Sequence, residues 1–208
     1  MARVSKPIED RERLSPPQRR ALILDAANRC FARDPDCSLR DIADEAGVSR
    51  QLVQLYFPGG GVGPVANVLF DEFVTQAPWL LADLPEGTRS TPDQTRARVE
   101  VIVNRGLDWA EATPGAWIFG PGRDLAGSGI GQRWEETQQA IAAMISSYPP
   151  FGLDDSPLTR TVIYAELRAL EVLIHAWRTG QISREDCEAA AVLRFTSLFA
   201  TTLPALTN

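Results

Sequence analysis

Side chains that can recognise nucleic-acid bases and phosphates lie close together between residues 49 and 56. Arginine pairs with guanine or phosphate, glutamine with adenine or phosphate, and a tyrosine hydroxyl binds phosphate. In this stretch they are Arg50, Gln51, Gln54 and Tyr56. The chemistry that they offer is hydrogen bonding to the edges and backbone of DNA, provided that a helix presents them together.

The local sequence predicts that helix and a second one before it. Ser38 and Asp41 have the spacing of a capping box, and apolar residues then recur at helical intervals up to residue 46. Gly47 favours a left-handed end to this helix, and Ser49 can cap the next. Such a pair is typical of a helix-turn-helix, whose second helix lies in the major groove. An ordinary antiparallel helix pair in an all-helical core is the alternative.

The wider stretch from residue 23 to 58, ILDAANRCFARDPDCSLRDIADEAGVSRQLVQLYFP, resembles the N-terminal DNA-binding domain of TetR/AcrR-type transcriptional regulators. The segment SLRDIADEAGVS carries the most specific part of the resemblance. The loop FPGGGVGP departs from the family, because it lacks the lysine that usually meets a phosphate there. Gln54 also stands where the family often has tyrosine. The residues expected to contact DNA are Ser38, Arg40, Ser49, Arg50, Gln51, Leu52, Gln54 and Tyr56, with Arg3 and Lys6 from the N-terminal arm.

The net charge of −6 is unevenly distributed along the chain. Residues 1–60 hold ten Lys or Arg and nine Asp or Glu, whereas residues 61–208 hold eleven and eighteen. The first 20 residues alone carry six basic and three acidic side chains. Positive charge is therefore concentrated next to the helix-turn-helix, where phosphate contacts need it. A merely solvated tail explains Arg3 and Lys6 equally well.

Helix signals along the chain predict an all-α protein of about nine helices. Residues 1–14 are expected to form a flexible basic arm, residues 15–62 a three-helix helix-turn-helix domain, and residues 63–208 a helical ligand-binding and dimerisation domain. Ser or Thr followed by Pro starts helices near residues 16, 92 and 157.

Two long helices near the C-terminus, 157–178 and 183–203, carry small and apolar residues on more than one face. They must therefore bury two surfaces, which predicts a twofold four-helix interface in a homodimer. Deep burial inside one large monomer is the alternative. The candidate interface residues are Leu173, His175, Trp177, Leu193, Thr196 and Phe199.

Aromatic residues in the larger domain are candidates for the lining of an apolar ligand cavity, although each one alone fits a core position too. They are Trp79, Trp109, Trp117, Phe119, Trp134, Tyr148 and Tyr164.

The sequence offers no catalytic constellation, and we expect no enzyme activity, cofactor or metal. His175 is the only histidine, and the three cysteines form no CxxC pair. No run approaches 18 uncharged apolar residues and the N-terminus is too charged for a signal peptide, which predicts a cytoplasmic protein without a membrane partner.

These observations predict a dimeric, ligand-responsive repressor of transcription that binds a near-palindromic double-stranded operator. Its effector is expected to be small and largely apolar. The alternative is a helical small-molecule-binding or scaffolding dimer that has lost operator binding, which the missing lysine and the acidic total charge favour. The sequence is silent on the identity of the effector and of the operator.

Overall fold

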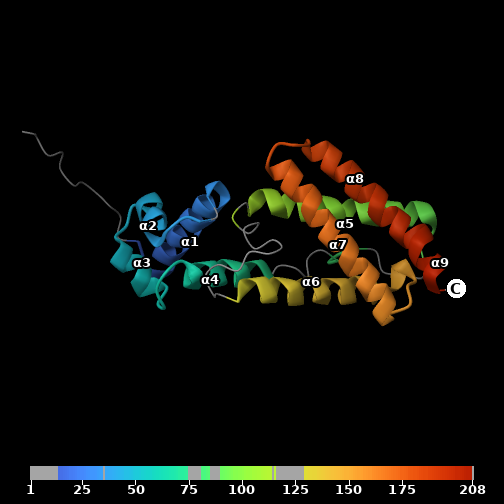
Figure 1. Ribbon diagram of the computed structural model, residues 1–208, viewed down its shortest axis with the longest axis horizontal. Helices are drawn as coiled ribbons and strands as arrows, with labels where there is room; N and C mark the ends of the chain where they lie inside the picture. Colours follow the sequence, from blue (N-terminus) through green and yellow to red (C-terminus); the bar gives the residue numbers. More distant parts are fainter. Residues whose placement is uncertain are drawn as a thin grey trace, which may run out of the picture.

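The computed structural model describes residues 14–34, 36–74, 81–84, 90–113, 115 and 129–207. These residues are helical and include no strand, which confirms the predicted all-α fold. The longer helices are α1 (Pro16–Arg33), α2 (Leu39–Ala46), α3 (Arg50–Tyr56), α4 (Gly63–Val74), α5 (Pro92–Ala112), α6 (Ile130–Ser146), α7 (Pro157–Arg178) and α8 (Arg184–Ser197). Helices α1–α3 gather at one end of an elongated molecule and α5, α7 and α8 at the other, and α4 and α6 run along one side, α4 beside the first group and α6 beside the second (Figure 1).

Side-chain caps begin the helices where the sequence predicts them. The side chains of Ser15, Ser38 and Ser183 each accept a hydrogen bond from the backbone N–H three residues later, and the backbone N–H of each serine donates to the side chain of that later residue. Ser49 caps α3 through the N–H of Leu52. Gly47 ends α2 in a left-handed conformation (φ 65°), which few other residues adopt without strain. The turn between α2 and α3 is therefore encoded locally.

Two hydrophobic cores hold the molecule together, and α6 contributes to both. The first contains the buried faces of α1–α4 together with Ile130 and Trp134 of α6. The second joins α5, α7 and α8 with Ala142 and Ile145, further along α6. The first core thus extends past residue 62, and the division of the chain at that residue stays a prediction.

Helix α6 is also fastened to α4 by polar contacts. The guanidinium group of Arg133 donates to Asn67 (2.7 Å), pairs with Asp71, and lies 4.7 Å from the centre of the Phe70 ring. The indole ring of Trp134 meets Phe70 edge to face, at 6.2 Å between ring centres. Movement of α6 must therefore displace α4 or break this set of contacts.

A close backbone approach links α1 to the residues that follow α5. The N–H of Gly115 donates to the side-chain carbonyl of Asn28 (2.7 Å). A Cβ atom at Gly115 would overlap the backbone carbonyl of Asn28, so no larger residue fits there without displacement.

A buried carboxylate lies between α6 and α7. Glu171 is 5% exposed and accepts hydrogen bonds from the indole N–H of Trp134 and from Gln138 (2.7 Å). Arg168 forms an ion pair with it at 3.0 Å. Burial raises the pKa of Glu171, although these donors and the charge of Arg168 oppose the rise, and Glu135 adds to it.

The C-terminal helix differs from the single helix that the sequence predicts from residue 183 to 203. Helix α8 is followed by a π-helical turn (η4, Leu198–Thr202) and a short helix α9 (Leu203–Thr207). Pro204, expected to end the helix, lies inside α9. Proline removes one backbone donor, and the wider turn directly before it absorbs the interruption.

The raised pKa of Glu171 makes stability depend on pH in a defined direction. In the window between its ordinary pKa of about 4.3 and its higher folded value, the native state binds more protons, so stability falls as pH rises. Glu171→Gln keeps an acceptor for Trp134 and Gln138 but does not titrate. We expect the wild type to lose stability relative to this variant as pH rises from 4 to 8, measured by urea unfolding. A difference that stays constant with pH would contradict the assignment.

Candidate nucleic-acid interface and internal cavity

Helix α3 presents one face to the core and the other to solvent. Val53 and Phe57 are buried, whereas Arg50 and Gln51 are exposed. Leu52, Gln54 and Tyr56 are half-buried at the edges of the exposed face. The structure therefore brings the predicted base-reading side chains of α3 to one surface.

Leu55 lies on this surface too, with 75% of its side chain exposed. The sequence prediction passed over it because leucine at helical spacing normally indicates core. The exposure of Leu55 can be predicted from its spacing, because it is two residues from both Val53 and Phe57, and residues two apart lie on opposite sides of a helix.

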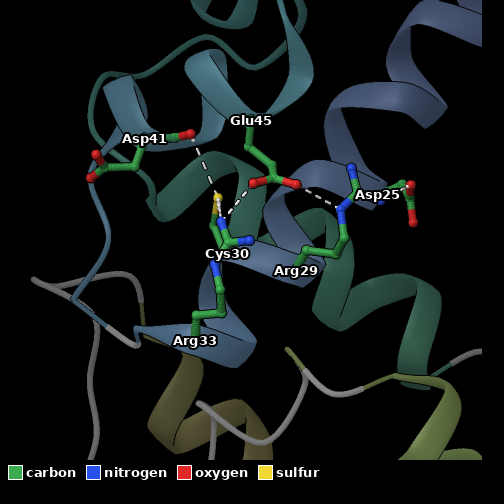
Figure 2. Close-up of polar contacts among 6 residues, drawn as sticks. All are labelled: Asp25, Arg29, Cys30, Arg33, Asp41 and Glu45. Carbon is green, nitrogen blue, oxygen red and sulfur yellow. Dashed lines mark hydrogen bonds and ion pairs between the residues drawn. The ribbon is translucent and has the colours of Figure 1, made fainter.

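Glu45 of α2 forms ion pairs with two arginines of α1 (Figure 2). Its carboxylate accepts hydrogen bonds from Arg29 (2.8 Å) and Arg33 (2.6 Å), two guanidinium groups one turn apart on α1. Arg29 also pairs with Asp25. These bonds hold the pKa of Glu45 below its usual range, Arg29 contributing most. Surface pairs of this kind add little stability. The shared apolar core therefore holds α2 against α1, and these pairs join the two helices at the surface.

The basic side chains near α3 differ in their partners. Arg40 on α2 is 82% exposed and lies 3.7 Å from Asp44, a weak pairing that DNA phosphates can replace. Arg50 forms no ion pair with any residue that the structure describes. Ser38 and Ser49 are exposed at the starts of α2 and α3. Arg3 and Lys6 lie outside the described residues.

A cavity lies between α5, α6, α7 and α8, in the second core. About 650 Å³ of space there is free of atoms, including the mouth that opens to solvent. The described residues that line it carry no charged or hydrogen-bonding side chain. They are Leu81, Val99, Ile102, Val103, Gly106, Leu107, Ile141, Met144, Ile145, Phe151, Leu167, Leu170, Ile174, Phe195 and Phe199.

Of the aromatic residues expected at a cavity, the four that the structure describes do not line this one. Trp134 lies in the first core and donates to Glu171, and Trp109 packs against both cores. Tyr164 donates its hydroxyl to Glu135, and Tyr148 packs on Phe151 from outside the lining. Buried tyrosine hydroxyl and indole N–H groups require hydrogen-bond partners, which are found where helices meet. The apolar cavity is therefore lined by aliphatic and phenyl groups. Trp79, Trp117 and Phe119 lie outside the described residues.

The expected interface residues are divided between surface and interior. Leu193 is 68% exposed on α8, His175 is exposed, and Leu173, Trp177 and Thr196 are half-buried. Phe199, in contrast, is buried, stacks on Phe151 (4.3 Å between ring centres) and lines the cavity. Phe199 follows the buried residues Val192 and Phe195 at helical spacing, seven and four residues on, so it lies on their face of the helix and not with Leu193.

Small and apolar side chains nevertheless form an outward stripe on both helices. Val172 of α7, which the sequence prediction omitted, is 64% exposed and lies on the side of α7 that carries Ala165 and Ala169. On α8 the exposed small and apolar side chains are Ala189, Leu193 and Ser197, and Ala200 is exposed in η4. Among the described helices, the run from Arg184 to Leu206 alone is long and apolar enough to cross a membrane by length and composition. Its outward apolar face is equally the surface that a helical dimer buries.

Comparison with known families identifies the helix-turn-helix. The family model "Bacterial regulatory proteins, tetR family" matches residues 23–59, which include α2, α3 and most of α1. A search of curated proteins finds no match.

Solved structures extend the likeness to the rest of the chain. A tetR-family transcriptional regulator from Streptomyces coelicolor aligns over 93% of this chain and 88% of its own, with 22% identity and a TM-score of 0.65. The fatty acid degradation regulator FadR from Bacillus halodurans aligns over 90% of this chain and 96% of its own, with 18% identity and a TM-score of 0.61. A TetR transcriptional regulator from Rhodococcus sp. RHA1 aligns over 89% of this chain and 97% of its own, with 15% identity and a TM-score of 0.58.

The predicted resemblance to TetR-type transcriptional regulators is therefore confirmed, by the family model in the N-terminal domain and by the fold over most of the chain.

The exposure of Arg50 leads to a test of the DNA-reading surface. We expect Arg50→Ala to weaken binding to an operator about 5- to 150-fold per half-site, because one good contact to a base contributes about 1–3 kcal/mol. Loss of a base contact relaxes sequence preference at one position of each half-site, whereas loss of a phosphate contact lowers the salt slope by about one per subunit. Fluorescence anisotropy over a salt series distinguishes the two.

Arg96→Ala is the matched control, because Arg96 is also an exposed arginine but lies on the surface of α5, where it pairs with Glu100. Equal losses in the two variants would contradict a specific role for Arg50.

Proposed function

We propose that this protein is a ligand-responsive transcriptional repressor that binds a near-palindromic operator as a homodimer in the cytoplasm. The observation that carries the proposal is the surface of α3, where Arg50 and Gln51 stand exposed within a segment that matches the tetR family model. Two such helices, one from each subunit, enter successive major grooves about 34–36 Å apart.

The stripes on α7 and α8 support the dimer. Val172 and Leu193 expose large apolar side chains among alanines, which lets helices of a second subunit approach closely. Twofold pairing of α7 and α8 forms a four-helix interface and matches the symmetry of a palindromic site.

The cavity supports an effector that is small and largely apolar. Its lining holds no charge to neutralise a charged ligand, and burial of a bare charge is costly. Ile141 and Met144 of α6 line the cavity and also line a neighbouring groove. Phe70 and Val74 of α4 form part of the wall of that groove. A ligand that displaces Ile141 and Met144 acts on α4, and through it on the spacing of the two α3 helices.

Selection of an operator from a random DNA pool by the full-length protein tests the regulator function. We expect an enriched sequence with two inverted half-sites, bound by a dimer in analytical ultracentrifugation, with affinity that falls steeply between 50 and 200 mM salt. A gel shift with the DNA upstream of the protein's own gene tests the nearest natural site.

Failure to enrich any sequence would overturn the repressor proposal. If the protein is then still dimeric and binds apolar ligands, the ligand-binding or scaffolding dimer without operator binding takes its place.

Gly106 gives direct access to the cavity. It lines the cavity from α5, and a Cβ atom placed there meets no atom within 4 Å. Gly106→Leu should therefore fill part of the space without strain and weaken the binding of an apolar probe such as 1-decanol by tenfold or more, measured by calorimetry.

Gly106→Ala is the control and should keep the affinity while raising stability by about 0.5–1 kcal/mol, as expected for removal of a glycine from a helix interior. Equal 1-decanol affinity in the wild type and Gly106→Leu would show that the ligand binds elsewhere.

A further inference from the structure

The exposed side chain of Leu55 has no structural role within the described part of the chain. It is the most exposed of the large apolar side chains there, at 75%. Val53 and Phe57, two residues to either side, face the first core, so Leu55 projects from the opposite side of α3. Single exposed apolar side chains are common on protein surfaces. Leu55 is distinguished by its place, on the outer face of α3 within the segment that matches the tetR family model.

Gln51 is the neighbour of Leu55 along this face. The two are four residues apart, and side chains so spaced lie about 5–6 Å from each other on a helix surface. Both are exposed. The outer face of α3 therefore combines a hydrogen-bonding amide with a branched apolar side chain, one helical turn apart.

The major groove offers complementary chemistry to this pair. An amide pairs with adenine through N6 and N7, and the C5 methyl group of thymine is the apolar feature on the base edges. Base pairs stack 3.4 Å apart along each strand, so side chains one helical turn apart meet neighbouring or next-neighbouring base pairs.

We propose that Leu55 contacts thymine methyl groups, so that α3 reads A·T base pairs through Leu55 together with Gln51. This rests on the proposed function, in which α3 enters the major groove, and adds what the helix recognises there. It also assigns a specificity-determining role to a residue outside the set expected from the sequence.

Deoxyuridine tests the contact at single-group resolution, because it differs from thymidine only in lacking the methyl group. Each thymine of the operator selected from the random pool is replaced in turn, symmetrically in both half-sites, and binding is measured by fluorescence anisotropy. With the wild type we expect at least one replacement to weaken binding about fourfold per half-site, the effect of losing one buried methyl-sized group.

Leu55→Ala should bind the thymine operator more weakly and respond to that same replacement less than twofold, since the partner of the methyl group is gone. Leu55→Met, which keeps an apolar side chain, should remain sensitive. Because Leu55 is exposed, both variants should unfold at the wild-type urea concentration.

The outcomes separate this inference from the function on which it rests. If an operator is selected and bound but no replacement weakens the wild type, or if Leu55→Ala loses as much as the wild type at the same position, the methyl contact is overturned while the regulator stands. If no operator is enriched, the methyl contact and the regulator function are both overturned. If Leu55→Ala alters only the subunit association measured by ultracentrifugation, Leu55 serves a protein contact and the inference is overturned.

Discussion

The position of α6 in two hydrophobic cores is the constraint on which the rest of the structure depends. Trp134 packs among the helices that carry the DNA-reading surface, while its indole N–H donates to Glu171 of α7. Two turns further on, Ala142 and Ile145 belong to the second core. A rigid helix shared in this way cannot move in one core without moving in the other.

In the proposed function, this arrangement provides a route from the cavity to α3, which lies remote from it. Ile141 and Met144 separate the cavity from the groove at α4, and Arg133 ties α6 to Asn67 and Asp71 of that helix. The cavity wall and the α4 contacts thus lie on one helix, so the coupling requires only that a ligand prefer one of two positions of α6. The uncharged lining selects apolar ligands for that role.

Sequence reasoning succeeded where the determinants are local and failed where they are not. Ser38, Gly47 and Ser49 encode caps and a turn within a few residues, so the helix-turn-helix was predictable. The cavity depends on which faces of α5, α6, α7 and α8 meet, and aromatic content alone does not contain that information. Phe199 illustrates the difference: its helical spacing from Phe195 indicates a buried face, but only the packing of the neighbouring helices makes that face the wall of a cavity.

The reciprocal linkage between cavity and operator tests the central claim most directly. The operator dissociation constant is measured with and without saturating 1-decanol, and the 1-decanol dissociation constant with and without saturating operator. Coupling through α6 predicts that each ligand weakens the other by the same factor, of about 5- to 150-fold. An operator affinity that stays unchanged while 1-decanol fills the cavity would contradict the account.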